Sequence, residues 1–501
     1  MHGKSFYSTL NNHYLMQAIS NHSSNNKIAV SFGYIAILAM CICCTNVYSQ
    51  QVVAQNKDSL TLFSKPVTYG QPTLPKKRFW RASGELMLVQ IIPFTFNRYI
   101  RHKDFAKISW ESIGDNLKFN SWRWDDNKFF NNQFSHPYQG SLYYSSFRSN
   151  GYSFWQSVPS AFVGSFMWEV AAETHPPAPN DFINTSMGGI TLGEMTYRLS
   201  NLIVNNKQRG FKRQVNEVFA FLVNPINGFN RIVDGKWGKV MDNPIDRKPD
   251  IVSGELDMGS RRFSEKGSND IINKGKNELY FRLRLQYGDP FKDVKKPFSN
   301  FNVTMEGGNN DSAKINTLRV SGFLHGWQLD GADSSTAEHV VNITTNYDFY
   351  FNSSFFYGGQ SVNISLLSHF QPAKKIRIQT QAGAGIIVLA AVQDEYLYYG
   401  EGRNYDYGPG VNLLADANLI VAEKLLFGVH YRGGWFSTVN GNKSTHFLNT
   451  VTSELKYSVT SRISLGTEWG HLNLHGKFEK YNDVNRSYPY LRVSAGYKFN
   501  W

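Results

Sequence analysis

The chain has 501 residues and is basic, with 52 lysines and arginines against 39 aspartates and glutamates, for a formal net charge of +13. Its mean hydropathy of −0.38 excludes a bundle of hydrophobic membrane helices, while its length allows one large barrel and a second domain. No feature indicates a nucleic-acid partner, so the positive charge favours outer-membrane lipids and lipopolysaccharide as partners.

The N-terminal segment, 1–49, is predicted to be a cleaved signal peptide. An uncharged apolar run, Ile28–Cys44, is followed by small residues that fit a cleavage site ending at Ser49. The alternative is an uncleaved anchor helix, and the true start is either Met1 or Met16. Residues 50–77 are predicted to form a linker.

The cysteines limit the chemistry of the mature chain. Cys41, Cys43 and Cys44 are the three cysteines of the sequence, and all lie inside the predicted signal peptide. The remaining chain therefore has no disulfide framework and no thiolate zinc site.

Residues 78–245 are predicted to form a small α-helical domain, periplasmic or plugging the barrel. Apolar segments punctuated by Pro and Gly predict helices over Gly84–Phe96, Ser153–Glu173, Asn180–Thr185 and Gly193–Val204. The second segment is near the length of a membrane span but is interrupted by polar residues. It is therefore expected to be amphipathic or buried, against the barrel wall or inside the lumen.

Residues 250–501 show a period of two and predict a mainly β, antiparallel transmembrane β-barrel. In Ile376–Val388, for example, Ile and Ala alternate with Arg, Gln and Gly. Strands that face lipid on one side and a polar lumen on the other produce this alternation. About eleven strands follow Gly275, and Ile251–Met258 supplies a first strand, so about 12 strands are expected.

The connections are predicted to alternate between short turns and long loops, as in outer-membrane barrels. Short turns are expected at Gln371–Lys374, Val421–Lys424 and Thr460–Arg462, and longer loops at Asp394–Asn404, Ser437–His446 and Lys477–Ser487.

The last segment, Leu491–Trp501, indicates both compartment and architecture. Its side chains alternate between apolar and polar, and the chain ends on the aromatic Trp501. This pattern resembles the closing strand of an outer-membrane barrel, whose terminal aromatic residue is part of the signal read by the barrel-assembly machinery. We therefore expect an outer-membrane location, with that machinery as a partner.

Candidate site residues lie in the helical domain. Glu169 and Glu173 are four residues apart, so on a helix they share one face, where carboxylates are costly unless paired, hydrated or ligating. His136 and Asp181 complete the candidate catalytic set of a general base or metal ligand with acids. Four further polar residues accompany this set: Ser141, Arg148, Glu194 and Arg198.

Two interpretations of these residues are open. In one, they form a buried hydrogen-bond network that fixes the helices, with Glu194 paired to Arg198 and Arg148 neutralising another acid. In the other, His136 and the acids are catalytic or bind a metal. Ser141 lies too close to His136 along the chain for a nucleophile–base pair, and no recognised catalytic motif is present. The sequence specifies neither a cofactor nor a metal.

The segments HPYQGSLYY, GSFMWEVAAE, PNDFINTSMGG and GEMTYRLS resemble an envelope family of Bacteroidetes, the domain of unknown function 3943. The resemblance covers roughly Arg78 to Val204, and the WE-x-x-x-E and GE-x-x-x-R segments are its most specific parts. It implies a shared unit that precedes a C-terminal β-rich region, and it implies no activity.

The sequence favours a non-enzymatic envelope protein, structural or transporting a lipid-like or small polar ligand. The alternative is an envelope lipid-modifying enzyme, a hydrolase or transferase acting on phospholipid or lipid A. A third interpretation, a surface adhesin, assigns function to the tyrosine-rich loop Asp394–Asn404.

Overall fold

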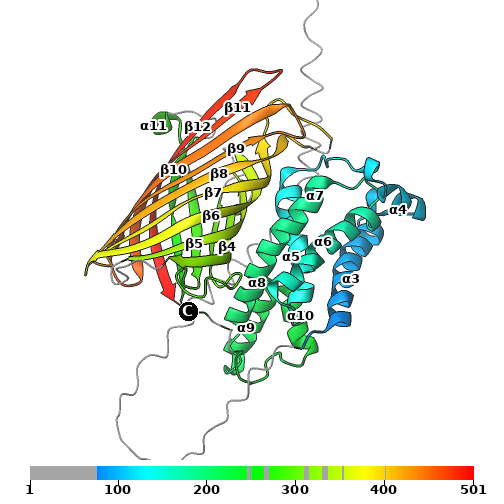
Figure 1. The fold of residues 1–501 in the computed structure, drawn as a ribbon, viewed down its shortest axis with the longest axis horizontal. Coiled ribbons are helices and arrows are strands. Elements are labelled where there is room, and N and C mark those ends of the chain that lie inside the picture. The colour runs from blue at the N-terminus through cyan, green and yellow to red at the C-terminus, as the bar shows by residue number, and fades with distance from the viewer. Residues whose placement is uncertain are drawn as a thin grey trace, which may run out of the picture.

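The structure is a computed structural model that describes residues 76–244, 247, 249, 251–264, 270–309, 315–329, 337–352, 355–400 and 402–500. The predicted signal peptide, nearly all of the predicted linker and the terminal Trp501 lie outside the described residues. The described chain forms a helical unit followed by a β-barrel (Figure 1).

Within the described residues, the C-terminal half is a closed barrel of twelve antiparallel strands, each paired with its neighbours in the chain. The barrel closes where β1 pairs with β12, with Ser253 opposite Asn500. The predicted fold class and strand number are confirmed. The strands are β1 (Val252–Phe263), β2 (Lys276–Tyr287), β3 (Phe301–Gly308), β4 (Ile315–Leu329), β5 (Ala337–Phe351), β6 (Phe356–Ala373), β7 (Ile376–Gln393), β8 (Tyr405–Val421), β9 (Leu425–Ser437), β10 (Ser444–Ser458), β11 (Ile463–Phe478) and β12 (Val484–Asn500), with a short helix α11 (Ile271–Lys274) between β1 and β2.

The outward face of the barrel is apolar and exposed. Met258, Leu279, Ile386, Leu413 and Val493 come from five different strands, and each is between 57% and 68% exposed. A closed barrel with such a belt is a transmembrane barrel, because its exposed apolar side chains face lipid in place of water. None of the described helices combines the length and the apolar character needed to cross a membrane.

The inward face carries a network of ion pairs. Arg284 of β2 donates to Glu454 of β10 (2.8 Å), and Arg492 of β12 donates to Glu306 of β3 (2.7 Å). Lys456 of β10 bonds Glu255 of β1 at 2.7 Å. These pairs join strands that are not neighbours in the sheet, so they bridge part of the lumen.

The loops differ in part from the prediction. The short turns between β6 and β7, β8 and β9, and β10 and β11 lie where they are expected. However, β9 extends to Ser437 and β10 begins at Ser444, while β11 extends to Phe478 and β12 begins at Val484. The two expected long loops there are therefore short, because pairing continues through their polar residues.

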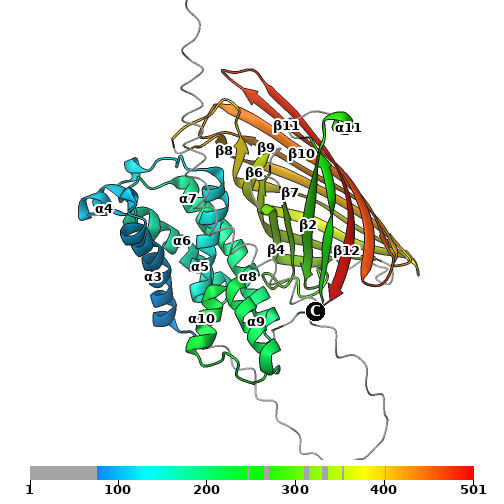
Figure 2. The ribbon, with the colours of Figure 1, turned by 180° about the vertical axis from the view of Figure 1, so that it is seen from behind.

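The helical unit lies beside the barrel in both views (Figures 1 and 2). Its helices are α3 (Phe79–Thr95), α4 (Trp110–Asn116), α5 (His136–Arg148), α6 (Phe154–Ala171), α7 (Pro179–Ile183), α8 (Gly189–Ile203), α9 (Gly210–Val223) and α10 (Pro225–Val233), with π-helical segments η1 (Phe96–Ile100), η4 (Asn131–Ser135) and η5 (Asn184–Gly188) and short 3₁₀ turns η2 (Asp104–Ala106) and η3 (Phe119–Ser121).

The unit packs on the outer wall of the barrel. One apolar cluster joins helical residues such as Phe129 and Leu199 to outward-facing strand residues, including Tyr287, Phe349 and Tyr405. Tyr287 ends β2 at the short-turn end of the barrel, whereas Phe349 and Tyr405 lie at the opposite end. The contact therefore runs along the wall between the two ends. Of the two positions expected for the helices, against the barrel wall or inside the lumen, the structure shows the first.

Four helices of the described helical unit have no counterpart in the prediction: α4, α5, α9 and α10. Their buried faces are largely polar, so the expected apolar stripe is absent on the inner side. Helix α10 buries Asn227, Gly228 and Asn230. The apolar stripe of α10 therefore marks its exposed face and not its buried face.

Candidate functional site

His136 is the first residue of α5, directly after the π-helical segment η4. Single π-helical turns inside α-helices frequently occur at functional sites, because the extra residue displaces a side chain from the regular spiral. A second π-helical segment, η5, lies opposite and contributes Thr185, whose hydroxyl lies 3.2 Å from His136 Nδ1. Thr185 therefore fixes the imidazole and leaves Nε2 facing the acids.

Glu169 lies near the end of α6. The helix begins with a capping box in which Ser153 and Gln156 each bond the other's backbone N–H, so its start is well defined. One oxygen of Glu169 accepts a hydrogen bond from the backbone N–H of Ala178 at 2.8 Å. The side chain is 1% exposed and is thus held between α6 and the start of α7.

Asp181 lies in the first turn of α7, which begins at Pro179. Its Oδ1 accepts a hydrogen bond from Asn180 at 2.7 Å, and Asn180 also donates to the hydroxyl of Tyr407. Tyr407 belongs to the outward face of β8, so the barrel wall positions this end of the site.

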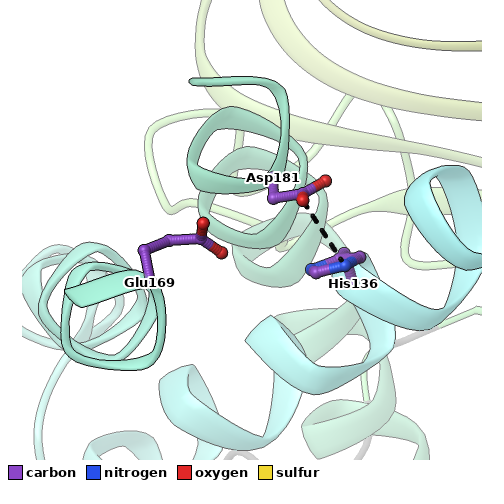
Figure 3. Close-up of side chains that lie close together, drawn as sticks. All are labelled: His136, Glu169 and Asp181. Atoms are coloured by element: carbon purple, nitrogen blue, oxygen red, sulfur yellow. Dashed lines mark ion pairs between the residues drawn. The ribbon is translucent and has the colours of Figure 1, made fainter. Parts of the chain in front are cut away.

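His136, Glu169 and Asp181 converge from three helices, and the Glu169 carboxylate points toward the other two side chains (Figure 3). One ligand atom from each residue lies within 4.8 Å of the others, and His136 Nε2 lies 3.8 Å from Asp181 Oδ2. The His136 side chain is 21% exposed, so the site opens to the surface beside the imidazole.

The close approach of α5 to η5 depends on Gly140. A Cβ atom at this position would lie 1.8 Å from the carbonyl oxygen of Thr185. Any side chain there forces the segments apart and moves Thr185 away from His136.

The acids of this site carry strongly perturbed pKa values. Burial, followed by the negative charge of Asp181, raises the pKa of Glu169 to about 8. Burial raises the pKa of Asp181 well above its usual range, with the nearby Asp125 adding to the effect. Within the described residues, no lysine or arginine pairs with Glu169 or Asp181, so His136 is the only basic side chain that offsets their charge.

Glu173 lies two residues beyond the last residue of α6, so the predicted single helical face for Glu169 and Glu173 is not fully formed. Asn116 donates to the backbone carbonyl of Glu173 at 3.0 Å and fixes the chain there. Burial, then the charge of Glu169, raises the pKa of Glu173 well above its usual range. Glu173 is therefore a proton-carrying neighbour of the three converging residues.

The other predicted acid, Glu194, belongs to a separate cluster. It accepts hydrogen bonds from Arg148 (2.7 Å), Arg198 (2.8 Å) and the hydroxyl of Tyr144 (2.7 Å). Although burial opposes it, the charge of Arg148 and then that of Arg198 hold the pKa of Glu194 below its usual value. This fully paired carboxylate joins α5 to α8 and has a structural role.

Ser141 is not part of the site. Its hydroxyl donates to the backbone carbonyl of Tyr138 in the same helix at 2.6 Å. With its proton bound there, Ser141 offers no nucleophile to His136.

Several supporting residues were missed by the sequence analysis: Asp125, Asn132, Asn180, Thr185 and Tyr407. Asn132 donates to Asp125 (2.7 Å) and to the hydroxyls of Tyr405 (2.9 Å) and Tyr407 (3.1 Å). The two tyrosines alternate with Asp406 on β8, which signals only that they share a face of a strand. Nothing in the sequence indicates which helix covers that face.

His136, Glu169 and Asp181 bring together ligand atoms that could hold a divalent cation. Imidazole with carboxylates suits Zn²⁺, Mn²⁺ or Fe²⁺, with ligand atoms roughly 2.0–2.2 Å from the metal. The hydroxyl of Thr185 leaves His136 Nε2 available, a second-sphere arrangement common among metal-binding histidines. The positive charge of the ion would also remove the repulsion between the buried carboxylates.

Fold and site together define a transmembrane β-barrel with a helical unit on its outer wall that holds a buried histidine–carboxylate cluster. Residues 121–226 match the model of the domain of unknown function DUF3943. The match includes His136, Glu169, Asp181 and the Glu194 cluster. No curated protein matches the chain.

Solved outer-membrane proteins share the barrel at low similarity. The NanC porin is 13% identical over 48% of this chain and 98% of its own, with a TM-score of 0.29. The KdgM porin is 11% identical over 48% and 98%, with a TM-score of 0.24. The outer-membrane channel DcaP of Acinetobacter baumannii is 9% identical over 50% and 96%, with a TM-score of 0.23. Scores this low carry no argument, so the architecture rests on the strand pairing itself.

Proposed function

We propose that this outer-membrane barrel protein carries a divalent-metal site in its helical unit and uses it to hydrolyse an ester or phosphoester bond of an envelope lipid. The observation that carries the proposal is the convergence of His136, Glu169 and Asp181 without a lysine or arginine partner in the described chain. Two buried carboxylates beside a partly buried histidine are costly to leave without a counter-charge, and a cation at this position offsets that cost.

Hydrolysis of an ester needs a nucleophilic water and a proton for the leaving oxygen. His136, Glu169 and Asp181 would hold the ion, which would supply a water with a pKa lowered to about 7 as the nucleophile. Hydrolysis would join the water oxygen to the ester carbon or phosphorus and release the ester oxygen as an alcohol. Glu173, whose pKa is raised by burial and by the charge of Glu169, holds a proton for this leaving oxygen.

The position of the site supports a lipid substrate. Asn180 and Asn132 bond Tyr407, close to the start of β8. That end of the barrel carries the loop from Asp394 to Asn404, so the site lies near one edge of the apolar belt. Ester and phosphate groups of lipids occupy this depth, where the exposed edge of His136 can meet them.

A second candidate function is passage of an ion or small solute through the barrel. The polar inward face favours it, while pairs such as Arg284–Glu454 narrow the path. Single-channel recording in planar bilayers tests this candidate. A conductance that is unchanged in Glu169→Gln, with no metal bound to the wild type, would make the channel the better account.

Metal binding tests the leading proposal. The full chain in detergent is stripped with a chelator, and its binding of Zn²⁺ and Mn²⁺ is measured by calorimetry and elemental analysis. We expect one ion per chain in wild type and in the control Glu111→Gln, an exposed acid of α4 in the same unit. His136→Ala and Asp181→Asn should each lose it.

Hydrolysis is tested on the envelope itself. Phospholipids and lipid A are compared by mass spectrometry in a deletion strain carrying wild type, Glu111→Gln, or His136→Ala with Glu173→Gln. A lipid species that accumulates only with the double variant supports hydrolysis. Identical lipid profiles, with all variants at equal levels in the outer membrane, would refute it.

A further inference from the structure

One helix of the unit, α10, has inverted polarity. It buries Asn227, Gly228 and Asn230 and exposes Phe229, Ile232 and Val233. A helix in water does the opposite, because burial of apolar surface drives its folding. The inner amides bond other helices: Asn227 donates to Ser200 and Asn201 of α8 (3.0 Å each), and Asn230 donates to Glu85 of α3 (3.1 Å).

Helix α3 exposes a longer apolar stripe. The stripe is Met87, Leu88, Ile91 and Ile92 and continues to Ile100 through η1, with exposures from 43% to 66%. Its buried face combines polar and apolar residues, and Gln90 donates to the carbonyl of Gly164 in α6 at 2.6 Å. Helix α3 is therefore apolar on its outer face as well as on much of its inner face.

Helix α6 repeats the arrangement with small residues. It buries Ser157, Ser160, Gly164 and Ser165, while Trp155, Val163 and Phe166 are exposed by 42% to 57%. Small residues at helix contacts, and polar side chains that bond across helices, are typical of helix packing within lipid.

On α3 and η1, the exposed charged side chains lie at the two ends of the apolar stripe. Between Arg81 and Arg98 of α3 and η1, the buried Glu85 is the sole charged side chain. That stretch is about 25 Å long at the rise of an α-helix, and the apolar band of an outer-membrane barrel is about 25 Å high. The two surfaces have matching heights.

We propose that the exposed face formed by α3, α6 and α10 lies against the acyl chains of the bilayer, as a continuation of the lipid-facing belt of the barrel. The helical unit covers part of the outward face of β2–β8 with the apolar cluster that contains Phe129 and Phe349. If the outer face of the helical unit were polar, it would interrupt the lipid-facing belt of the barrel. An apolar outer face continues the belt.

The assembled face contacts lipid in this proposal, and no described helix crosses the membrane by itself, because the polar side chains of these helices turn toward the other helices. The proposal does not depend on the metal site, and the metal-binding experiment and the one below can fail separately.

Spin labels test the location of the face. Cys41, Cys43 and Cys44 are replaced by serine in the full chain, and single cysteines are introduced at Ile92 and Val163. The matched controls are Leu413 on the barrel belt, which is 57% exposed, and Glu111 on α4. Each protein is reconstituted in phosphatidylethanolamine–phosphatidylglycerol vesicles, and collisions of the label with oxygen and with a water-soluble nickel chelate are measured.

We expect labels at Ile92 and Val163 to match the label at Leu413, with frequent oxygen collisions and few nickel collisions. Nickel collisions as frequent as those at Glu111 would place the face in water and overturn the proposal. Low collision rates with both reagents would show that a second copy or another protein covers the face, which would also overturn it.

Discussion

Two buried acidic clusters lie in the same helical unit and differ in one respect, the presence of arginine. Glu194 meets Arg148 and Arg198, and its pKa is lowered despite burial, which opposes this. Glu169 faces His136 and further acids but no arginine among the described residues, and burial, then the charge of Asp181, raises its pKa to about 8. Burial alone therefore does not distinguish a structural carboxylate from a binding one, whereas the charge of its neighbours does.

The largest expected effect comes from breaking the paired cluster. Glu194→Gln leaves Arg148 and Arg198 buried without a counter-charge, so we expect a loss of about 3–5 kcal/mol in the free energy of unfolding. Urea unfolding followed by circular dichroism at 222 nm measures it in detergent. A loss below about 1 kcal/mol would show that the pairs are solvated and that the contrast between the clusters is false.

The second prediction concerns the sign of the pH dependence. Burial and the charge of Asp181 raise the pKa of Glu169 from its ordinary value of 4.5 to about 8 in the folded chain, so the folded state holds the proton more tightly. Its contribution to stability is complete below about pH 4.5 and is lost as the pH rises through about 8. Metal-free wild type should lose up to about 1.4 kcal/mol per pH unit in that window.

Glu169→Gln should flatten this slope, because the amide has no proton to lose. Thermal unfolding at pH 5, 6, 7 and 8 with chelator present compares the two proteins. An equal slope in both would mean that Glu169 is ionised without cost, and the site would then need no cation.

The smallest expected effect is on metal affinity and comes from Thr185, which contacts His136. Thr185→Val removes the hydroxyl beside His136 Nδ1 and keeps the shape of the side chain. We expect metal affinity to fall by about 10–100-fold, while unfolding changes by about 1 kcal/mol. Unchanged affinity for Zn²⁺ in calorimetry would show that the imidazole needs no orienting partner.

The sequence predicts the barrel well and the helical unit in part. Strand patterns such as Ile376–Val388 report a local environment, apolar on one face and polar on the other, so pairing in chain order follows directly. The buried faces of the helical unit cannot be predicted in this way, because the inner residues of α9 and α10 are mostly polar. Glu217 of α9, for example, is fully buried and paired with Arg213 and Arg231.

The site shows the same limit. Spacing indicates the pairing of Glu194 with Arg198, because it occurs within one helix. The convergence of His136, Glu169 and Asp181 requires three helices, two π-helical segments and the close contact at Gly140. The docking of the unit on the wall depends on contacts such as Tyr347 to Gln133, more than two hundred residues apart, and periodicity carries no information about these.

The tyrosines at the start of β8 tie the timing of the site to the assembly of the barrel. Asn132 and Asn180 find their hydroxyl partners only on the outer wall, and that wall exists only once β5 to β8 have paired. A chain whose barrel has not closed therefore holds an incomplete site. Under the proposed function, such a protein would be inactive during export and would become active when its barrel inserts.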